Sequence, residues 1–79
     1  MTLDQYKAEI NKMLDRLDEL NKNQDYDAYL ASLNRLSETI SRAMKRHDDE
    51  SLVDLNKYII YTIKMLELAI DYDIVTLKS

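Results

Sequence analysis

Glycine and proline are both absent from this chain of 79 residues, and no other feature limits its fold as strongly. Tight β-hairpin turns and phosphate-binding loops depend on glycine, because it adopts positive φ angles and lets the backbone approach a ligand closely. Their absence argues against a sheet fold with tight turns and excludes a glycine-rich phosphate loop. The residues that remain are mostly helix formers. The composition therefore predicts an all-α protein.

Three segments repeat apolar residues at intervals of three and four, as one face of an α-helix requires. The first segment covers residues 3–21, where Thr2 is the expected N-cap and Gln5 completes a capping box. The second covers residues 25–46 and the third covers residues 49–74. Their apolar faces consist of Leu3, Tyr6, Ile10, Met13, Leu17 and Leu20; of Tyr26, Tyr29, Leu33, Leu36, Ile40 and Ala43; and of Leu52, Leu55, Ile59, Ile63, Leu66, Ile70 and Leu77.

Two interruptions of this pattern predict the turns between the helices. In residues 21–25, Asn and Asp tolerate left-handed backbone, and Asp25 is the expected cap of the second helix. Near residues 46–49, basic side chains end one helix and acidic side chains begin the next, so each sign suits the local helix dipole. We therefore expect a single domain of residues 1–79, folded as a small up-down-up antiparallel three-helix bundle.

The third predicted helix is apolar on two faces. Besides its core face it carries a second set of apolar residues, centred roughly 140° away, so that the apolar arc approaches 240°. We call this second set the tyrosine stripe, and it consists of Tyr58, Tyr61, Met65, Leu68, Tyr72 and Val75. Residues 58–63 are also aromatic, β-branched and uncharged, a composition typical of aggregation-prone segments. Packing must therefore hold this segment in a helix.

Three interpretations compete for this arc. A membrane span is excluded, because Lys57, Lys64 and Glu67 interrupt a segment that would need about 20 apolar residues. The third helix could instead be the innermost helix of the bundle, with its tyrosine hydroxyls reaching water. Alternatively, the other two helices cover only one face, and the tyrosine stripe binds a second copy of the protein or a helix of another protein.

The chain offers few groups for catalysis or metal binding. Cysteine is absent and His47 is the only histidine, which is expected at the end of the second helix. The carboxylates beside it, in residues 48–50, are adjacent in sequence, and adjacent residues rarely converge on one ion. Nucleophilic triads and dinucleotide-binding motifs are also absent. We therefore expect no enzymatic activity, metal, cofactor or small-molecule substrate.

An arginine track on the second helix supports a different function. Arg35, Arg42 and Arg46 fall within about 40° of one another on its outer face, where they could contact phosphates. However, the 11 basic and 15 acidic residues give a net charge of -4, which does not favour broad contact with nucleic acid. Direct nucleic-acid binding by a small regulator therefore remains the alternative.

The sequence thus favours a non-enzymatic protein-protein interaction module, such as a small helical adaptor, inhibitor or chaperone-like protein. Helix packing through the tyrosine stripe would be its mechanism, with self-association preferred over binding to another protein. The first ten residues are charged where the apolar core of a secretion signal would lie. We therefore expect the protein to act in the cytoplasm.

Overall fold

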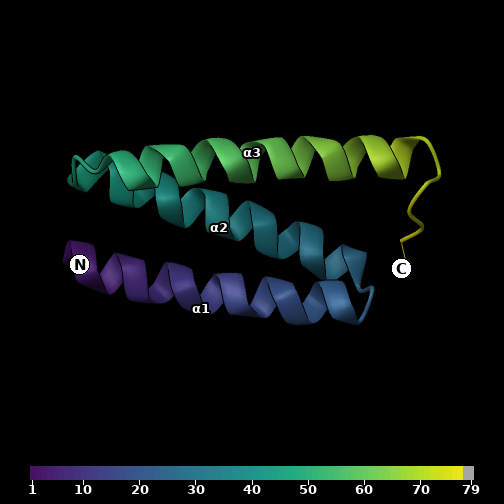
Figure 1. The fold of residues 1–79 in the computed structure, drawn as a ribbon, viewed down its shortest axis with the longest axis horizontal. Helices are drawn as coiled ribbons and strands as arrows, with labels where there is room; N and C mark the ends of the chain where they lie inside the picture. The colour runs from purple at the N-terminus through teal and green to yellow at the C-terminus, as the bar shows by residue number, and fades with distance from the viewer. Residues whose placement is uncertain (78–79) are drawn as a thin grey trace.

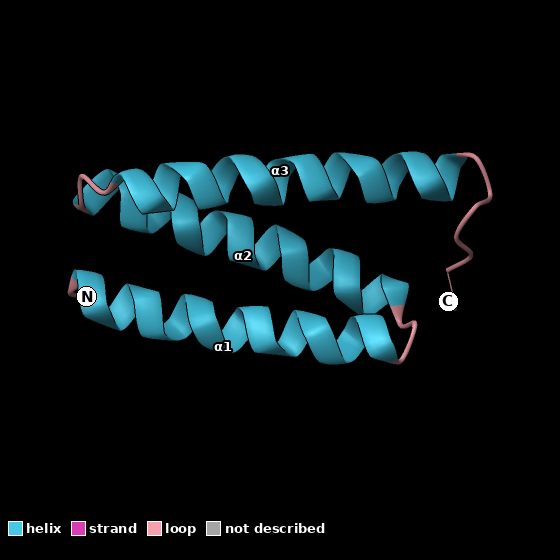
Figure 2. Cartoon of the chain, viewed as in Figure 1, coloured by secondary structure: helices cyan, strands magenta, loops and turns pink. Residues whose placement is uncertain are grey.

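The computed structural model describes residues 1–77 and consists of three α-helices joined by short loops (Figures 1 and 2). Helix α1 spans Leu3–Lys22, α2 spans Tyr26–Arg46 and α3 spans Glu50–Asp71. This confirms the predicted all-α fold, and the observed helices begin within one residue of their predicted positions. Residues 78 and 79 of the predicted domain lie outside the described part of the chain.

The three helices alternate in direction along the chain, and α2 lies between the other two (Figure 1). Helix α2 packs against both α1 and α3. Within residues 1–77, no Cα atom of α1 lies within 8 Å of a Cα atom of α3. The bundle is therefore open on the side where α1 and α3 flank α2. The interpretation that the third helix is innermost is wrong, because α2 occupies that position.

The central helix supplies three of the four largest fully buried side chains, Leu33, Leu36 and Ile40. On α2, Leu36 and Ile40 are fully buried, and each buried aliphatic side chain of this size stabilises the fold by about 1.5 to 3 kcal/mol. Helix α1 contributes four residues to the buried hydrophobic core, as many as α2, and α3 contributes two. The buried hydrophobic core consists of Tyr6, Ile10, Leu17, Leu20, Leu33, Leu36, Ile40, Ala43, Leu52 and Ile59.

Side-chain caps fix the N-terminus of each helix. The Thr2 hydroxyl accepts a hydrogen bond from the Gln5 backbone N–H at 3.2 Å, and the Gln5 side chain accepts one from the Thr2 N–H at 2.8 Å. Asp25 caps α2 by accepting from the Ala28 N–H at 3.4 Å. These contacts confirm the predicted capping box and the predicted cap of the second helix. They satisfy backbone donors that the helix geometry leaves free.

Helices α1 and α3 end in the same left-handed turn, made without glycine. Gln24 has a φ of 56° and Asp73 a φ of 58°. After α3, the Asp73 N–H donates to the Ile70 carbonyl and the Ile74 N–H to the Ala69 carbonyl, which is a Schellman motif. The third helix therefore ends at Asp71 and not at the predicted residue 74. Leu77, assigned by sequence to the core face of this helix, follows the helix instead.

Gln24→Gly is expected to raise the free energy of unfolding by about 1 kcal/mol, because glycine adopts this left-handed backbone without the steric cost that a Cβ atom imposes. The Gln24 N–H donates to the Asn21 carbonyl, and this bond is retained in the variant. Urea denaturation followed by circular dichroism measures the change. Gln24→Ala serves as the control and should not stabilise the protein. An unchanged midpoint for Gln24→Gly would show that the turn is not strained.

Candidate interaction surface on α3

The tyrosine stripe lies on the surface of the molecule. Tyr58, Tyr61, Met65 and Leu68 belong to α3, and Tyr72 is its C-cap. The exposed fractions of these five side chains range from 47% for Met65 to 75% for Tyr72. Five large hydrophobic side chains at helical spacing form an apolar surface that no other part of residues 1–77 covers.

Val75, the sixth residue of the predicted stripe, does not continue this helical line. It follows the turn at Asp73 and is half-buried. The sequence pattern placed it on the stripe because its spacing from Tyr72 is three residues, as in a continuing helix. The chain reverses in the turn, since the Val75 N–H donates back to the Ala69 carbonyl at 3.2 Å. The helical part of the stripe therefore ends at Tyr72.

Two sides of α3 have opposite environments because each residue advances the side-chain direction by about 100°. Ile59 is buried against the core, whereas its neighbours Tyr58 and Ile60 are exposed. Thr62 is turned inward by its spacing, and its hydroxyl donates to the Tyr58 carbonyl at 2.9 Å. This bond satisfies the hydroxyl within the helix, so it needs no contact with α1 or α2.

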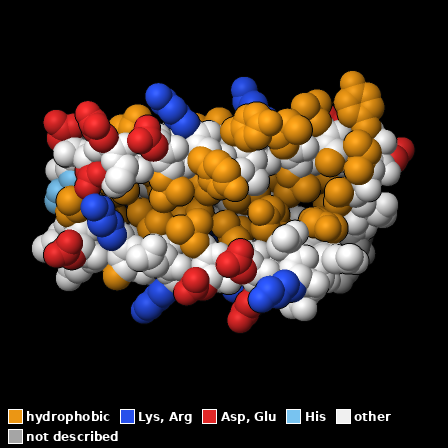
Figure 3. Space-filling view, viewed as in Figure 1, with side chains coloured by type: hydrophobic (Ala, Val, Ile, Leu, Met, Phe, Trp, Pro, Cys, Tyr) orange, Lys and Arg blue, Asp and Glu red, His pale blue; other side chains and the backbone are white. Residues whose placement is uncertain are grey.

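An open groove joins the tyrosine stripe to the rest of the bundle. Tyr58 lines this groove together with Leu14 and Leu17 of α1, Leu33 of α2 and Thr62. In Figure 3, hydrophobic side chains gather along the middle of this face, between α1 and α3, and continue over the C-terminal half of α3. The stripe and the groove therefore form one continuous apolar face.

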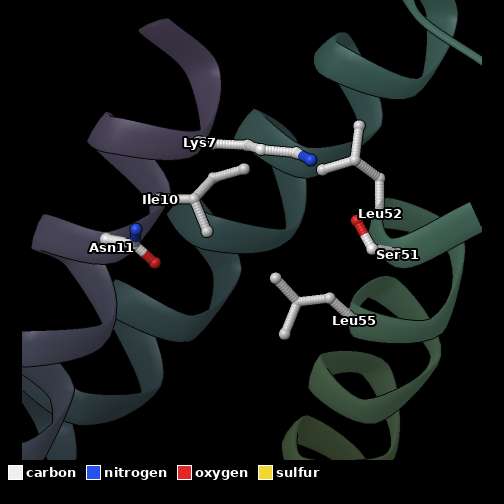
Figure 4. Close-up of a pocket in the computed structure, with 6 residues that line it drawn as sticks. All are labelled: Lys7, Ile10, Asn11, Ser51, Leu52 and Leu55. Carbon is white, nitrogen blue, oxygen red and sulfur yellow. The ribbon is translucent and has the colours of Figure 1, made fainter. Parts of the chain in front are cut away.

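Polar contacts bridge α1 and α3 at the end where α3 begins, beside a second hollow that is separate from the groove. Lys7 reaches from α1 toward the first turn of α3, with Ile10 and Leu55 below it (Figure 4). Its Nζ lies 2.9 Å from the Asp49 Oδ2. The Ser51 hydroxyl donates to Asp49 at 2.6 Å and the Ser51 backbone N–H donates at 2.8 Å. The α1–α3 gap is thus bridged by an ion pair at this end.

These bonds shift the ionisation of Asp49. The hydrogen bond from the Ser51 hydroxyl, and after it the bonds from Lys7 and the Ser51 N–H, lower the pKa of the Asp49 carboxyl far below its usual range. Because the pKa is lower in the folded state, the bonds to the ionised Asp49 carboxylate stabilise the fold at neutral pH. This stabilisation is lost only as the pH falls below about 4, through the lowered folded-state pKa. The bridge is therefore intact at physiological pH.

Two aromatic side chains, Tyr29 and Tyr58, are part of the lining of the groove. Burial raises the pKa of Tyr29 above its usual value, and the nearby Tyr58 and Asp18 raise it further. The neutral phenol is therefore the stable form here, as expected for a ring withdrawn from water.

The sequence pattern missed one residue that lines the groove, Leu14, because it lies beside the predicted apolar face of the first helix. The one signal in the sequence was that Leu14 is apolar and directly follows Met13, which belongs to that face.

The arginine track is exposed along α2. The Arg42 Nη2 donates to the Thr39 hydroxyl at 3.4 Å, and that hydroxyl donates to the Arg35 carbonyl at 3.0 Å. Arg35 also lines a shallow hollow between α1 and α2 together with Glu9. Lys12 and Arg16 line the same hollow, so basic side chains outnumber the acidic one beside Arg35. Phosphate contact by Arg35, Arg42 and Arg46 stays a prediction.

His47 contacts the N-terminal part of the chain. It is the C-cap of α2, and its Nε2 lies 3.3 Å from the Met1 carbonyl oxygen. Its ring packs edge-on against the Tyr6 ring, with 5.8 Å between the ring centroids. No group of three His, Cys, Asp or Glu side chains in residues 1–77 is arranged to hold a metal ion. Across the described residues we also find no helical segment whose length and apolarity would allow it to span a bilayer.

Comparison with known proteins gave no matching family model, no matching curated protein and no matching solved structure. The functional argument therefore depends on the geometry of the apolar face.

Proposed function

We propose that the protein is a non-enzymatic interaction module that associates with a second copy of itself through the tyrosine stripe on α3. The observation that supports this proposal is the exposure of Tyr58, Tyr61, Met65, Leu68 and Tyr72 on one side of a helix whose other side is already buried. Tyrosine provides a large, rigid contact area at low entropic cost, and methionine adapts to the shape of its neighbours.

The size of the domain adds to this argument. A chain of 79 residues buries only about 60 to 65% of its unfolded surface on folding, so its stability is modest unless association adds buried area. The bundle is open between α1 and α3, which leaves part of its apolar surface facing water. A partner helix on this face removes more apolar surface from water and stabilises the folded state through mass action.

A second copy is the preferred partner because the stripe carries opposite charges at its two ends. Lys57 precedes Tyr58 at one end, and Asp71 precedes Tyr72 at the other. A copy of α3 turned end for end brings each lysine near an aspartate of the other chain. Such complementarity sets the orientation of a complex and disfavours incorrect partners.

The double variant Tyr61→Glu with Tyr72→Glu is expected to raise the dissociation constant of the dimer at least about 100-fold, because it places two charges in a desolvated contact. Both side chains are exposed, so the helical content should not change. Light scattering across a concentration series measures the mass, and circular dichroism measures the helicity. The matched control is Ala8→Glu with Ala31→Glu, which adds the same charge at exposed positions on α1 and α2.

A wild-type protein that remains a monomer at tens of micromolar would contradict self-association. Two further outcomes are informative. If both double variants dimerise equally, then the stripe is not the interface. If the protein binds a heparin column at low salt and elutes steeply with salt, the arginine track becomes the better candidate, since phosphate contact is salt-dependent and apolar packing is not.

A further inference from the structure

We infer that the two copies pair α3 against α3 in antiparallel orientation, with Tyr58 opposite Leu68 of the second copy and Tyr61 opposite Met65 of the second copy. This inference rests on the proposed self-association and adds its geometry. It follows from the spacing of the stripe, from the point where α3 ends and from the charges at the stripe's edges.

The spacing of the stripe is that of a two-stranded helical contact. Tyr58, Met65 and Tyr72 repeat every seven residues, and Tyr61 and Leu68 fall between them at the same interval. These are the two core positions of a heptad repeat. The helix is about 15 Å long between Tyr58 and Leu68, which provides four apolar side-chain layers in a symmetric pair. A second helix with the same pattern fits this surface.

A parallel arrangement conflicts with the residue that precedes the stripe. Asp54 occupies the next core position toward the N-terminus of α3 and is exposed. In a parallel, in-register pair Asp54 faces its own copy, and two carboxylates opposed in this way repel each other. In the antiparallel pair Asp54 lies opposite Tyr72, whose hydroxyl can donate a hydrogen bond to the carboxylate.

The end of α3 selects one antiparallel register. Shifting the pair by one heptad toward the C-terminus pairs Tyr61 with Tyr72 and Met65 with Leu68, but it leaves Tyr58 opposite Val75 of the second copy. The helix ends at Asp71, and the chain reverses at Asp73, where φ is 58°. Val75 is therefore not on the helical surface. A shift in the other direction leaves fewer apolar pairs, because the stripe begins at Tyr58. The register with Tyr58 opposite Leu68 keeps all four apolar layers within α3, whereas the shifted register depends on Tyr72, which is the C-cap.

This register also pairs unlike charges at the edge of the contact. Lys57 lies about one turn or less from Asp71 of the second copy, and the two-fold axis repeats this pair. Both residues are exposed in the single chain, and no ion pair is found between them within it. The two Lys64 side chains approach each other near the axis, where their long stems diverge into water. The net effect favours the antiparallel dimer.

Two single charge reversals and their mixture test this inference. Lys57→Glu and Asp71→Lys should each raise the dissociation constant about 10-fold or more, since each places like charges at two points of the dimer. When the two single variants are mixed, both edge contacts pair unlike charges again. Sedimentation equilibrium should then show a heterodimer with an affinity within about threefold of the wild type. Lys12→Glu on α1 makes the same charge change away from α3 and should leave the affinity unchanged.

The outcomes separate this inference from the proposed function. A wild-type dimer whose single variants are weakened and whose mixture recovers supports the antiparallel register. A wild-type dimer that shows no recovery on mixing overturns the register but leaves self-association in place. A wild-type monomer overturns the proposed self-association and this inference with it. The double variant Lys57→Glu with Asp71→Lys in one chain should also dimerise like the wild type, and a loss of dimer there would overturn the pairing.

Discussion

Leu36→Ala is expected to lower the free energy of unfolding by about 3 to 4 kcal/mol, because truncating a fully buried leucine removes apolar contacts and leaves a cavity. Leu36 has no exposed surface and lies on α2, the helix that packs against both others. A domain of this length has a total stability of about 4 to 12 kcal/mol. The substitution therefore removes a large share of it and affects the contacts of all three helices.

Urea denaturation at fixed protein concentration measures this loss, because the proposed self-association would make the apparent stability depend on concentration. Leu36→Met is the matched control. It keeps nearly the same volume, so its cost should stay under about 1.5 kcal/mol. A Leu36→Ala midpoint close to that of the wild type would mean that α2 is not the centre of the core.

Local features of this fold could be predicted from the sequence because they depend on a few neighbouring residues. The capping box of Thr2 and Gln5 is one example, and the cap at Asp25 is another. Each places a side-chain acceptor next to free backbone N–H groups, and no distant contact is needed. The apolar period likewise identified the buried apolar residues of α2, but it missed Thr39, which is also buried although its side chain is polar.

The openness of the bundle could not be predicted in the same way. The residues of an apolar face do not identify the helix that covers it. The order of the helices around the core is set by contacts between residues distant in sequence. The sequence left the third helix either innermost or exposed on one side, and the structure places α2 in the middle. The end of α3 was also predicted three residues too far. Asp73 adopts a left-handed conformation that glycine usually marks, and this chain has no glycine.

Ile59→Asp and Ile60→Asp are expected to differ strongly although the two residues are adjacent. The Ile59 side chain is 1% exposed and the Ile60 side chain is 41% exposed. A carboxylate at position 59 enters the apolar core without a partner, so we expect a loss of more than about 4 kcal/mol and an unfolded chain at room temperature. At position 60 the same carboxylate remains in water, one turn from Lys57 and Lys64, and the loss should stay below about 1 kcal/mol.

Circular dichroism of the two variants tests the two-sided character of α3, on which the interaction surface depends. A folded Ile59→Asp variant would show that α3 does not pack on α2 through this face, and the exposed stripe would then have no structural basis. Ile60 lies outside the tyrosine stripe, so Ile60→Asp should keep both its helicity and its dimer mass. If only its dimer mass falls, then the contact between the two copies extends around α3 beyond the stripe, toward Ile60.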